Sequence, residues 1–400
     1  MKLTSLVVST PQGSSGHVLT SAADFIYRYD TGALPDRAIS LTMPVRSEEF
    51  RRRDLHPIFQ MNLPEGYVLE QLRNRLAKTV SVDAMLLLAL SGSSSPIGRV
   101  QVRSTIVDTL LGGRTFPGEK LQEILTWDGA EDIFLGLLDR YILRAGISGV
   151  QPKVLVPEQS SAQLSRATSR ASDLIIKSGR DEYPGLAINE FLCMSVAKEV
   201  GLPVPEFYLS NNAKLFVMRR FDRDAQLNAI GFEDMAALMG LSADQKYSKS
   251  YAAIAKAIRV FCPIEQVQSS LEQLFDSVAL SCIVGNGDAH LKNFGLLYSD
   301  PTRRDARLAP AYDIVNTTAY IPDDVLALDL AGNKSMFASR QGLLEFAQTC
   351  DVERPKDRLR KILHALEAVL ARYPEQCERA PHIVQAIRRA AAPFMLTFDQ

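Results

Sequence analysis

Polar side chains with a recognisable spacing lie in one short segment, residues 285–294, which reads GNGDAHLKNF. Asp288 and Asn293 have four residues between them, and this D-x-x-x-x-N spacing is typical of phosphoryl-transfer loops. A carboxylate accepts the proton of an attacking hydroxyl, and an amide oxygen suits a hard cation such as Mg²⁺. Two glycines allow a sharp turn beside a ligand. The segment therefore predicts a loop that orients an acceptor hydroxyl and binds a metal ion.

A second carboxylate follows a predicted hairpin. Residues 294–298 and 307–311 are typical of two short strands joined by a polar turn, and Asp313 comes just after them. A hairpin would bring Asp313 back beside Asn293, so that two oxygen ligands converge on one metal ion. The alternative is a turn that caps its own backbone. His290 is expected mainly to hydrogen-bond the loop backbone.

A cation for nucleotide phosphates is predicted upstream. Lys177 ends the apolar run 174–177, LIIK, which is similar to the V-A-I-K strand whose ammonium reaches the phosphates of ATP. Glu190, on a predicted helix thirteen residues later, is a candidate partner for it, and a solvated helix face is the alternative. Residues 146–153, GISGVQPK, contain small residues whose backbone N–H groups could approach phosphate oxygens. That string alone is also typical of an ordinary turn.

The elements that must position these residues divide the chain into three parts. Residues 111–117, rich in glycine, predict a linker. The part before it, 1–110, mixes short β-like runs with turns and one helix near 64–78. Strands and helices follow in 118–230, including a helix over 187–200. From 231 to 400 helices dominate, with a buried one at 271–283 just before the GNGD loop and an amphipathic one at 359–370. The predicted fold class is α+β.

Composition excludes several classes of protein. The chain has 400 residues, 46% apolar, with 45 lysines and arginines against 46 aspartates and glutamates. Nothing in that balance demands a nucleic-acid or membrane surface, and no apolar run reaches the roughly 20 residues of a membrane span. The five cysteines lack zinc spacing, and Cys282 is expected to be an inert core thiol. We expect a soluble cytoplasmic protein with reduced thiols.

Together these motifs resemble the HipA family of bacterial serine/threonine protein kinases, the toxins of HipA–HipB toxin–antitoxin pairs. The resemblance covers roughly residues 1–340 and implies a two-lobed protein-kinase-like fold. Its parts would be a β-rich N-terminal subdomain (1–110), an ATP-binding region (118–230) and an all-α C-terminal lobe (231–400). The matching strings are ISGVQPK (147–153), LIIK (174–177), INEF (188–191), RRFDR (219–223), NGDAHLKN (286–293) and AYDIV (311–315), with LTMPVR (41–46) and NLPEG (62–66) near the N-terminus.

The resemblance also implies roles for individual residues and two cofactors, ATP and Mg²⁺. Asp288 matches the catalytic aspartate, with Lys177 and Asn293 beside it in the catalytic set. Asn293 and Asp313 match the metal ligands. The nucleotide-binding positions are Lys177, Gly149, Val150, Gln151, Arg219, Phe221 and His290, of which Gly149, Val150 and Gln151 match the phosphate loop and Arg219 and Phe221 lie where the family's hinge meets adenine.

Regulation and partners are implied in the same way. The family autophosphorylates a serine near the phosphate loop, and Ser148 is the candidate here; some members carry that serine where this chain has Ala145 or Gly146. The expected partners are a HipB-like helix-turn-helix antitoxin, through which DNA is contacted indirectly, and a protein substrate, an aminoacyl-tRNA synthetase. Two alternatives remain open: a small-molecule kinase of the aminoglycoside-phosphotransferase or lipid-kinase type, and an inactive kinase fold that serves as a co-repressor.

Overall fold

The computed structural model describes residues 3–21, 23–76, 82–111, 118–144, 151–159, 173–179 and 182–398. The chain divides into two compact units. The first unit comprises residues 1–178, 210–243 and 297–304, and the second comprises 179–209, 244–296 and 305–400. The three parts expected from the sequence stay a prediction. The linker predicted over 111–117 lies outside the described residues except for residue 111, which ends a helix.

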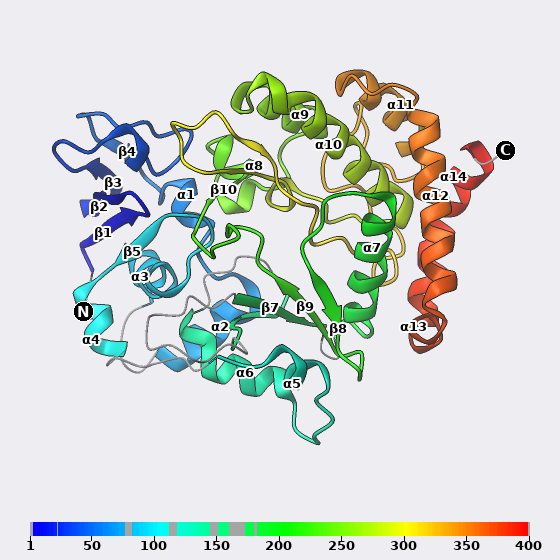
Figure 1. Ribbon diagram of the computed structural model, residues 1–400, viewed down its shortest axis with the longest axis horizontal. Helices are drawn as coiled ribbons and strands as arrows, with labels where there is room; N and C mark the ends of the chain where they lie inside the picture. Colours follow the sequence, from blue (N-terminus) through cyan, green and yellow to red (C-terminus); the bar gives the residue numbers. More distant parts are fainter. Residues whose placement is uncertain are drawn as a thin grey trace. The chain divides into compact units, whose positions relative to one another are not determined.

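The first unit begins with a five-stranded antiparallel sheet in the order β4-β3-β2-β1-β5. Residues of β1 alternate between exposed and buried, with Leu6 and Val8 in the core, as expected for a strand with one solvated face. The α3 helix packs against β5 (Figure 1). The elements are β1 (Ser5–Thr10), β2 (Gly13–Ser21), β3 (Asp24–Tyr29), β4 (Phe50–Arg52), α1 (Pro57–Gln60), α2 (Gly66–Leu76), α3 (Ala84–Ser94), β5 (Gln101–Arg103) and α4 (Thr105–Leu111).

A second antiparallel sheet of this unit contains β6, β7 and β9, with β7 in the centre. Every residue of β7 is buried, which explains its continuous apolar run, because a strand covered on both faces need not alternate. In the register, Lys177 lies opposite Lys153 on one side and Phe216 on the other. The remaining elements are α5 (Leu121–Leu125), α6 (Ile133–Tyr141), β6 (Lys153–Pro157), β7 (Asp173–Ser178), β9 (Leu215–Arg219), β10 (Gly231–Asp234) and α8 (Met235–Leu238).

The second unit is mostly helical. Helix α10 contacts α7, α9, α12 and α14, and α12 lies beside α14 (Figure 1). The predicted helices at 187–200, 271–283 and 359–370 are confirmed, and α10 begins earlier than expected, after Pro263. Its elements are α7 (Leu186–Val200), β8 (Phe207–Leu209), α9 (Tyr251–Phe261), α10 (Ile264–Val284), β12 (Arg307–Leu308), α11 (Ser339–Thr349), α12 (Pro355–Arg372), α13 (Pro374–Arg379) and α14 (Pro381–Phe398), and β11 (Gly295–Tyr298) begins here.

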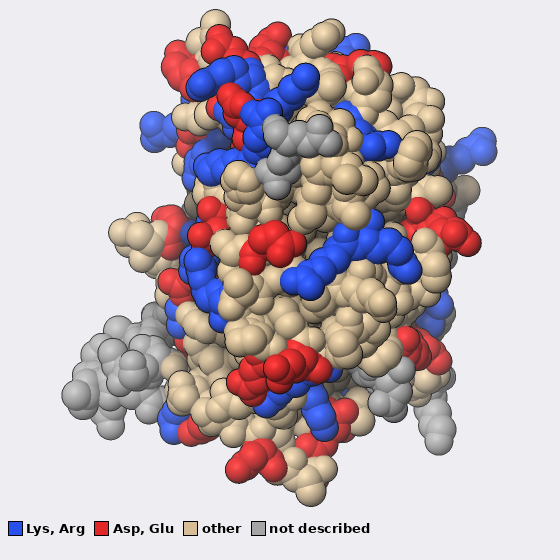
Figure 2. Space-filling model, turned by 90° about the vertical axis from the view of Figure 1, so that its right-hand side faces the viewer, with Lys and Arg blue, Asp and Glu red and all other residues tan. Residues whose placement is uncertain are grey.

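The region from residue 231 onward is not all-α, as the resemblance implied, because it includes the short strands β10, β11 and β12. Of these, β11 and β12 confirm the two strands predicted over 294–298 and 307–311. Cys282 is buried, and burial raises the pKa of its thiol to about 12, which agrees with an inert core residue. Among the helices that the structure describes, not one is long and apolar enough to span a bilayer. On the face drawn in Figure 2, basic and acidic side chains are interspersed rather than gathered by sign.

Candidate functional site

The end of α10 determines where the GNGD loop begins. The helix ends at Gly285, whose φ of 75° lies in the left-handed region that glycine adopts without strain. The backbone N–H of Asn286 then donates to the carbonyl of Ser281 at 2.8 Å, a Schellman-type closure of the last turn. Asn286 is 1% exposed, and its side-chain oxygen accepts the N–H of Asp288 at 3.0 Å. The buried helix therefore holds the start of the loop firmly.

Gly287 occupies a position where a side chain has no room. A Cβ atom there would lie 2.1 Å from Oδ2 of Asp324 and 2.6 Å from the carbonyl oxygen of Val325. The segment around residues 317–325 packs on the loop, and the Gly287 N–H donates to the Thr317 hydroxyl at 2.7 Å. The second glycine of the motif is thus required by close packing beside Asp288.

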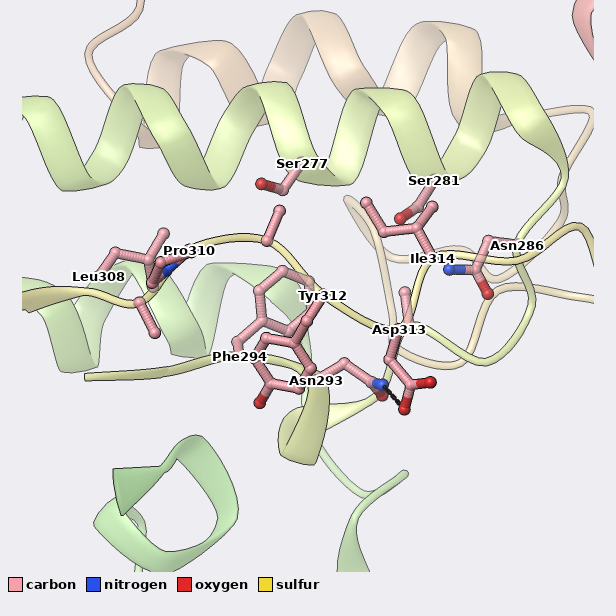
Figure 3. A pocket seen from close by; sticks show the side chains of 13 residues that line it. Ser277, Ser281, Asn286, Asn293, Phe294, Leu308, Pro310, Tyr312, Asp313 and Ile314 are labelled. Atoms are coloured by element: carbon pink, nitrogen blue, oxygen red, sulfur yellow. Dashed lines mark hydrogen bonds between the residues drawn. The ribbon is translucent and has the colours of Figure 1, made fainter. Parts of the chain in front are cut away.

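The structure brings Asn293 and Asp313 together, as the hairpin argument predicts. Nδ2 of Asn293 donates to Oδ2 of Asp313 at 3.1 Å (Figure 3). The amide oxygen of Asn293 accepts the backbone N–H of His290 at 3.1 Å, so both ends of the amide are oriented. The return of the chain is held by a hydrogen bond from the Ala309 N–H to the Gly295 carbonyl, at 2.8 Å. Asp313 has a φ of 60°, a strained conformation of the kind found at functional sites.

A small pocket adjoins the Asn293–Asp313 pair. Figure 3 shows Asn293 and Asp313 at one end of it, below Ser277 and Ser281 of α10. The remaining walls are mainly apolar and come from residues 286, 289, 294, 308–312 and 314. The two polar side chains thus lie beside packed apolar groups, which limits their freedom to change orientation.

The donor set fits a magnesium ion that shares its coordination with phosphate. One amide oxygen and one carboxylate are hard ligands, and an amide oxygen has a second lone pair beyond the one that accepts the His290 N–H. Across the part of the chain that the structure describes, there is no group of three or more His, Cys, Asp or Glu side chains suited to a metal. Mg²⁺ commonly needs only one or two protein carboxylates together with waters and substrate phosphates. The pair therefore fits that mode of binding and does not form an all-protein cage.

Asp288 lies on the exposed side of the loop, with 52% of its side chain exposed. Its Oδ1 accepts a hydrogen bond from the hydroxyl of Tyr247 at 2.7 Å and is 3.9 Å from Nε2 of His290. The His290 ring is buried against the edge of Tyr247, with 5.2 Å between centroids. Burial, and then the charge of Lys246, lowers the pKa of His290 to about 3, so the imidazole is neutral at physiological pH. The carboxylate is thus open to an acceptor, and His290 is suited to packing beside it.

Lys177 is located on a rigid strand of the first unit. It is 3% exposed, and its Nζ is 5.7 Å from the centre of the Phe216 ring. Lys153, which lies opposite it in the register, is also buried, and paired residues of antiparallel strands face the same side of the sheet. Glu190 is fully buried on α7 of the second unit, so its pairing with Lys177 stays a prediction, as does the phosphate-binding role of Lys177.

The RRFDR string is held by contacts within the first unit. Arg219 makes a two-pronged ion pair with Glu158, with N···O distances of 3.0 and 2.6 Å. The Phe221 ring packs edge-on against Phe232, with 5.6 Å between centroids. Their predicted contact with adenine stays a prediction. Between them, the guanidinium of Arg220 is buried and joins segments that are far apart in the sequence.

The phosphate-loop positions are described only in part. Ser148, Gly149 and Val150 lie outside the described residues, and Gln151 is half-buried just before β6. Sequence reasoning missed Tyr247 and Arg220. For Arg220 the charge alternation Arg-Phe-Asp was a weak signal of an internal ion pair. Tyr247 gave no signal, because it lies 41 positions before its partner Asp288.

Comparison with known proteins identifies the family. The sequence model of the HipA-like C-terminal domain matches residues 145–373, and that of the HipA N-terminal domain matches residues 6–103. The chain belongs to the HipA family. A solved HipA-family structure from Shewanella oneidensis MR-1, titled as a toxin–antitoxin system of HipA, HipB and its operator DNA, aligns over 98% of this chain and 97% of its own. The TM-score is 0.68 at 18% identity, which shows the shared kinase-like fold.

Curated relatives carry kinase names. A Sinorhizobium fredii protein named "Putative kinase Y4dM" is 29% identical over 301 residues, which are 70% of this chain and 67% of that protein. The "Serine/threonine-protein kinase toxin HipA" of Shewanella oneidensis is 25% identical over 196 residues, 44% of either chain. The names of these two relatives support kinase activity in general for the chain.

Proposed function

We propose that the chain is an ATP- and Mg²⁺-dependent protein serine/threonine kinase that acts as the toxin of a toxin–antitoxin pair. The observation that carries this proposal is the contact of Asn293 with Asp313, 3.1 Å apart, at the base of a loop whose exposed side presents Asp288. The amide of Asn293 presents its nitrogen to Asp313 and its oxygen to the loop backbone. An amide and a carboxylate that can each supply an oxygen ligand, with an exposed carboxylate on the same loop, fit a phosphoryl-transfer site. The kinase names of the HipA-family relatives support the same reaction class.

In the proposed reaction, Asp288 orients the acceptor hydroxyl and accepts its proton as the oxygen attacks the γ-phosphorus. The new oxygen–phosphorus bond forms as the bond to the β-phosphate oxygen breaks, and ADP leaves. Asn293 and Asp313 would hold Mg²⁺, which supplies charge stabilisation to the phosphates when bound. Lys177 would neutralise phosphate charge from its strand. Catalysis then depends on positioning and electrostatics, without a covalent enzyme intermediate.

The finer parts of the proposal concern partners and regulation. A HipB-like helix-turn-helix antitoxin is proposed because the solved relative is titled as a complex of HipA, HipB and operator DNA. The net charge of −1 favours indirect contact with DNA, through that partner. The proposed substrate is an aminoacyl-tRNA synthetase, and Ser148 is the proposed autophosphorylation site. Gly149, Val150, Gln151, Arg219, Phe221 and His290 would complete the nucleotide site.

The test compares wild type with Asp288→Asn in the full-length chain, using γ-labelled Mg-ATP and cell lysate. We expect Asp288→Asn to lower phosphoryl transfer at least about 100-fold, because a positioned base contributes about that much. Calorimetry should find nucleotide binding retained. Asp357→Asn is the matched control, since its side chain is similarly exposed, at 55%, on α12.

The location of the label distinguishes the candidate functions. Label on a protein band supports the proposal, and label on a soluble metabolite would instead indicate a small-molecule kinase. A chain that does not bind ATP would be the inactive co-repressor. Undiminished transfer by Asp288→Asn would remove Asp288 from the assigned role.

A further inference from the structure

Tyr247 donates a hydrogen bond to the proposed catalytic carboxylate, and none of the motifs predicts it. Its hydroxyl lies 2.7 Å from Oδ1 of Asp288, across 41 positions of sequence. Both residues belong to the second unit, and both are open to solvent, with Tyr247 43% exposed and the Asp288 side chain 52% exposed. The contact therefore lies on the open side of the loop, where an acceptor would approach.

The segment that carries Tyr247 is tied to the same loop. The N–H of Leu291 donates to the carbonyl of Lys246 at 3.2 Å, and the Tyr251 hydroxyl donates to the carbonyl of Ala289 at 3.1 Å. The Tyr247 ring itself packs against the buried ring of His290. Contacts from residues 246 and 251, on both sides of Tyr247, thus hold the phenol against the part of the loop that follows Asp288.

A carboxylate on the open side of a loop can in general occupy more than one rotamer. A hydrogen bond from a phenol to one of its oxygens favours the rotamer in which that bond is made. We propose that Tyr247 is a positioning residue, which holds Asp288 in the orientation that receives the proton of the acceptor hydroxyl. This inference depends on the proposed kinase function.

The proton balance is simple. Tyr247 keeps its own proton throughout, and the proton released by the acceptor hydroxyl moves to Asp288. Tyr247 acts only through Asp288, so its loss should slow the chemical step and leave the affinity for ATP unchanged.

The experiment measures ADP formation from Mg-ATP by the full-length chain, with water or the chain's own hydroxyls as acceptors. Tyr247→Phe keeps the ring on His290 and removes only the hydroxyl, whereas Tyr247→Ala removes both. We expect Tyr247→Phe to lower kcat about tenfold, the low end for a hydrogen bond to a charged group because this one is partly exposed. KM for ATP should stay within about twofold.

Tyr208→Phe is the matched control, because Tyr208 is also a tyrosine of the second unit whose hydroxyl donates to an exposed carboxylate, that of Glu206, at 3.1 Å. It should leave kcat unchanged. In an Asp288→Asn background, Tyr247→Phe should have no further effect on kcat, since the hydroxyl acts through the carboxylate.

Three outcomes would count against the inference. If Tyr247→Phe equals wild type while Tyr247→Ala is slow, Tyr247 serves only to pack on His290. If KM rises and kcat is unchanged, Tyr247 belongs to nucleotide binding. A wild-type chain that neither forms ADP nor labels a protein of the lysate would contradict the proposed function itself, which is a different result from an active wild type with an unimpaired Tyr247→Phe variant.

Discussion

Arg220→Met should destabilise the first unit by about 3 kcal/mol. The guanidinium of Arg220 is 1% exposed and donates to both oxygens of Asp222, at 2.8 and 2.6 Å, and to Asp173 at 3.2 Å. Methionine preserves apolar volume but leaves two buried carboxylates without this cation, and breaking a buried pair in that way costs roughly 3–5 kcal/mol. Arg223, 3.2 Å from Asp222, still supplies one positive charge, so we expect the lower end of that range.

The neighbouring residue provides a matched control. Arg219 also makes a two-pronged ion pair, with Glu158, but its side chain is 33% exposed. Water screens such a pair, and its loss typically costs no more than about 1 kcal/mol. Arg219→Met and Arg220→Met change the same residue type at adjacent positions, so the difference between them measures the effect of burial.

Urea unfolding can be followed in the first unit alone, because the single tryptophan, Trp127, belongs to it. A local probe is needed, since a chain with two units is not expected to unfold in one step. The expected result is a much lower urea midpoint for Arg220→Met than for Arg219→Met. Equal midpoints for the two variants would refute the assignment of Arg220 as the cation that balances the buried carboxylates.

The pH dependence gives an independent check. Burial alone would raise the pKa of Asp222, but the charges of Arg220 and Arg223 outweigh it and hold the pKa at about 2. A carboxylate whose folded-state pKa is depressed stabilises the fold above its unfolded pKa of about 3.9, and that stabilisation, roughly 2 kcal/mol, is lost as the pH falls through about 2. Arg220→Met should therefore lose less stability than wild type on acidification over this range.

The remaining predictions concern one residue in each unit. Gly287→Ala should abolish most ADP formation and also lower thermal stability, because its Cβ would displace Asp324 and the Val325 carbonyl beside Asp288. Gly136→Ala, where a Cβ meets nothing within 4 Å, should leave ADP formation unchanged, and a fully active Gly287→Ala would contradict the packing argument. Glu233 of β10 is fully buried and accepts hydrogen bonds from the Ser40 hydroxyl, the Leu41 N–H and the Tyr298 hydroxyl. Burial outweighs these bonds and raises the pKa of Glu233, so its contribution to stability is present below the unfolded pKa and is lost as the pH rises through the folded one. Urea titrations at about pH 5 and about pH 8 should show a smaller fall in the free energy of unfolding for Glu233→Gln than for wild type, because glutamine cannot ionise. An equal fall in the two proteins would contradict this prediction.

Local sequence determined a large part of this protein. The spacing of Asp288 and Asn293, the apolar strand ending in Lys177 and the helical periodicity before Gly285 each depend on residues close together in the chain. The meeting of Asn293 with Asp313 was predictable for the same reason, since a hairpin over 20 positions brings them together. The geometry of a helix, a strand or a hairpin is nearly the same in every fold, so the spacing of residues within one such element predicts which of them lie close together.

Tertiary structure alone decided the contacts between distant segments. Arg220 reaches the backbone of Ser95, 125 positions away, and Tyr247 reaches Asp288 across 41. Nothing in the sequence around Gly287 indicates that Asp324 packs against it. Such pairs follow from how buried helices and sheets pack, which depends on the shape of the whole core and is not recorded in any local periodicity. The sequence by itself therefore determined which groups perform the proposed chemistry, and the packed chain decided which neighbours orient them.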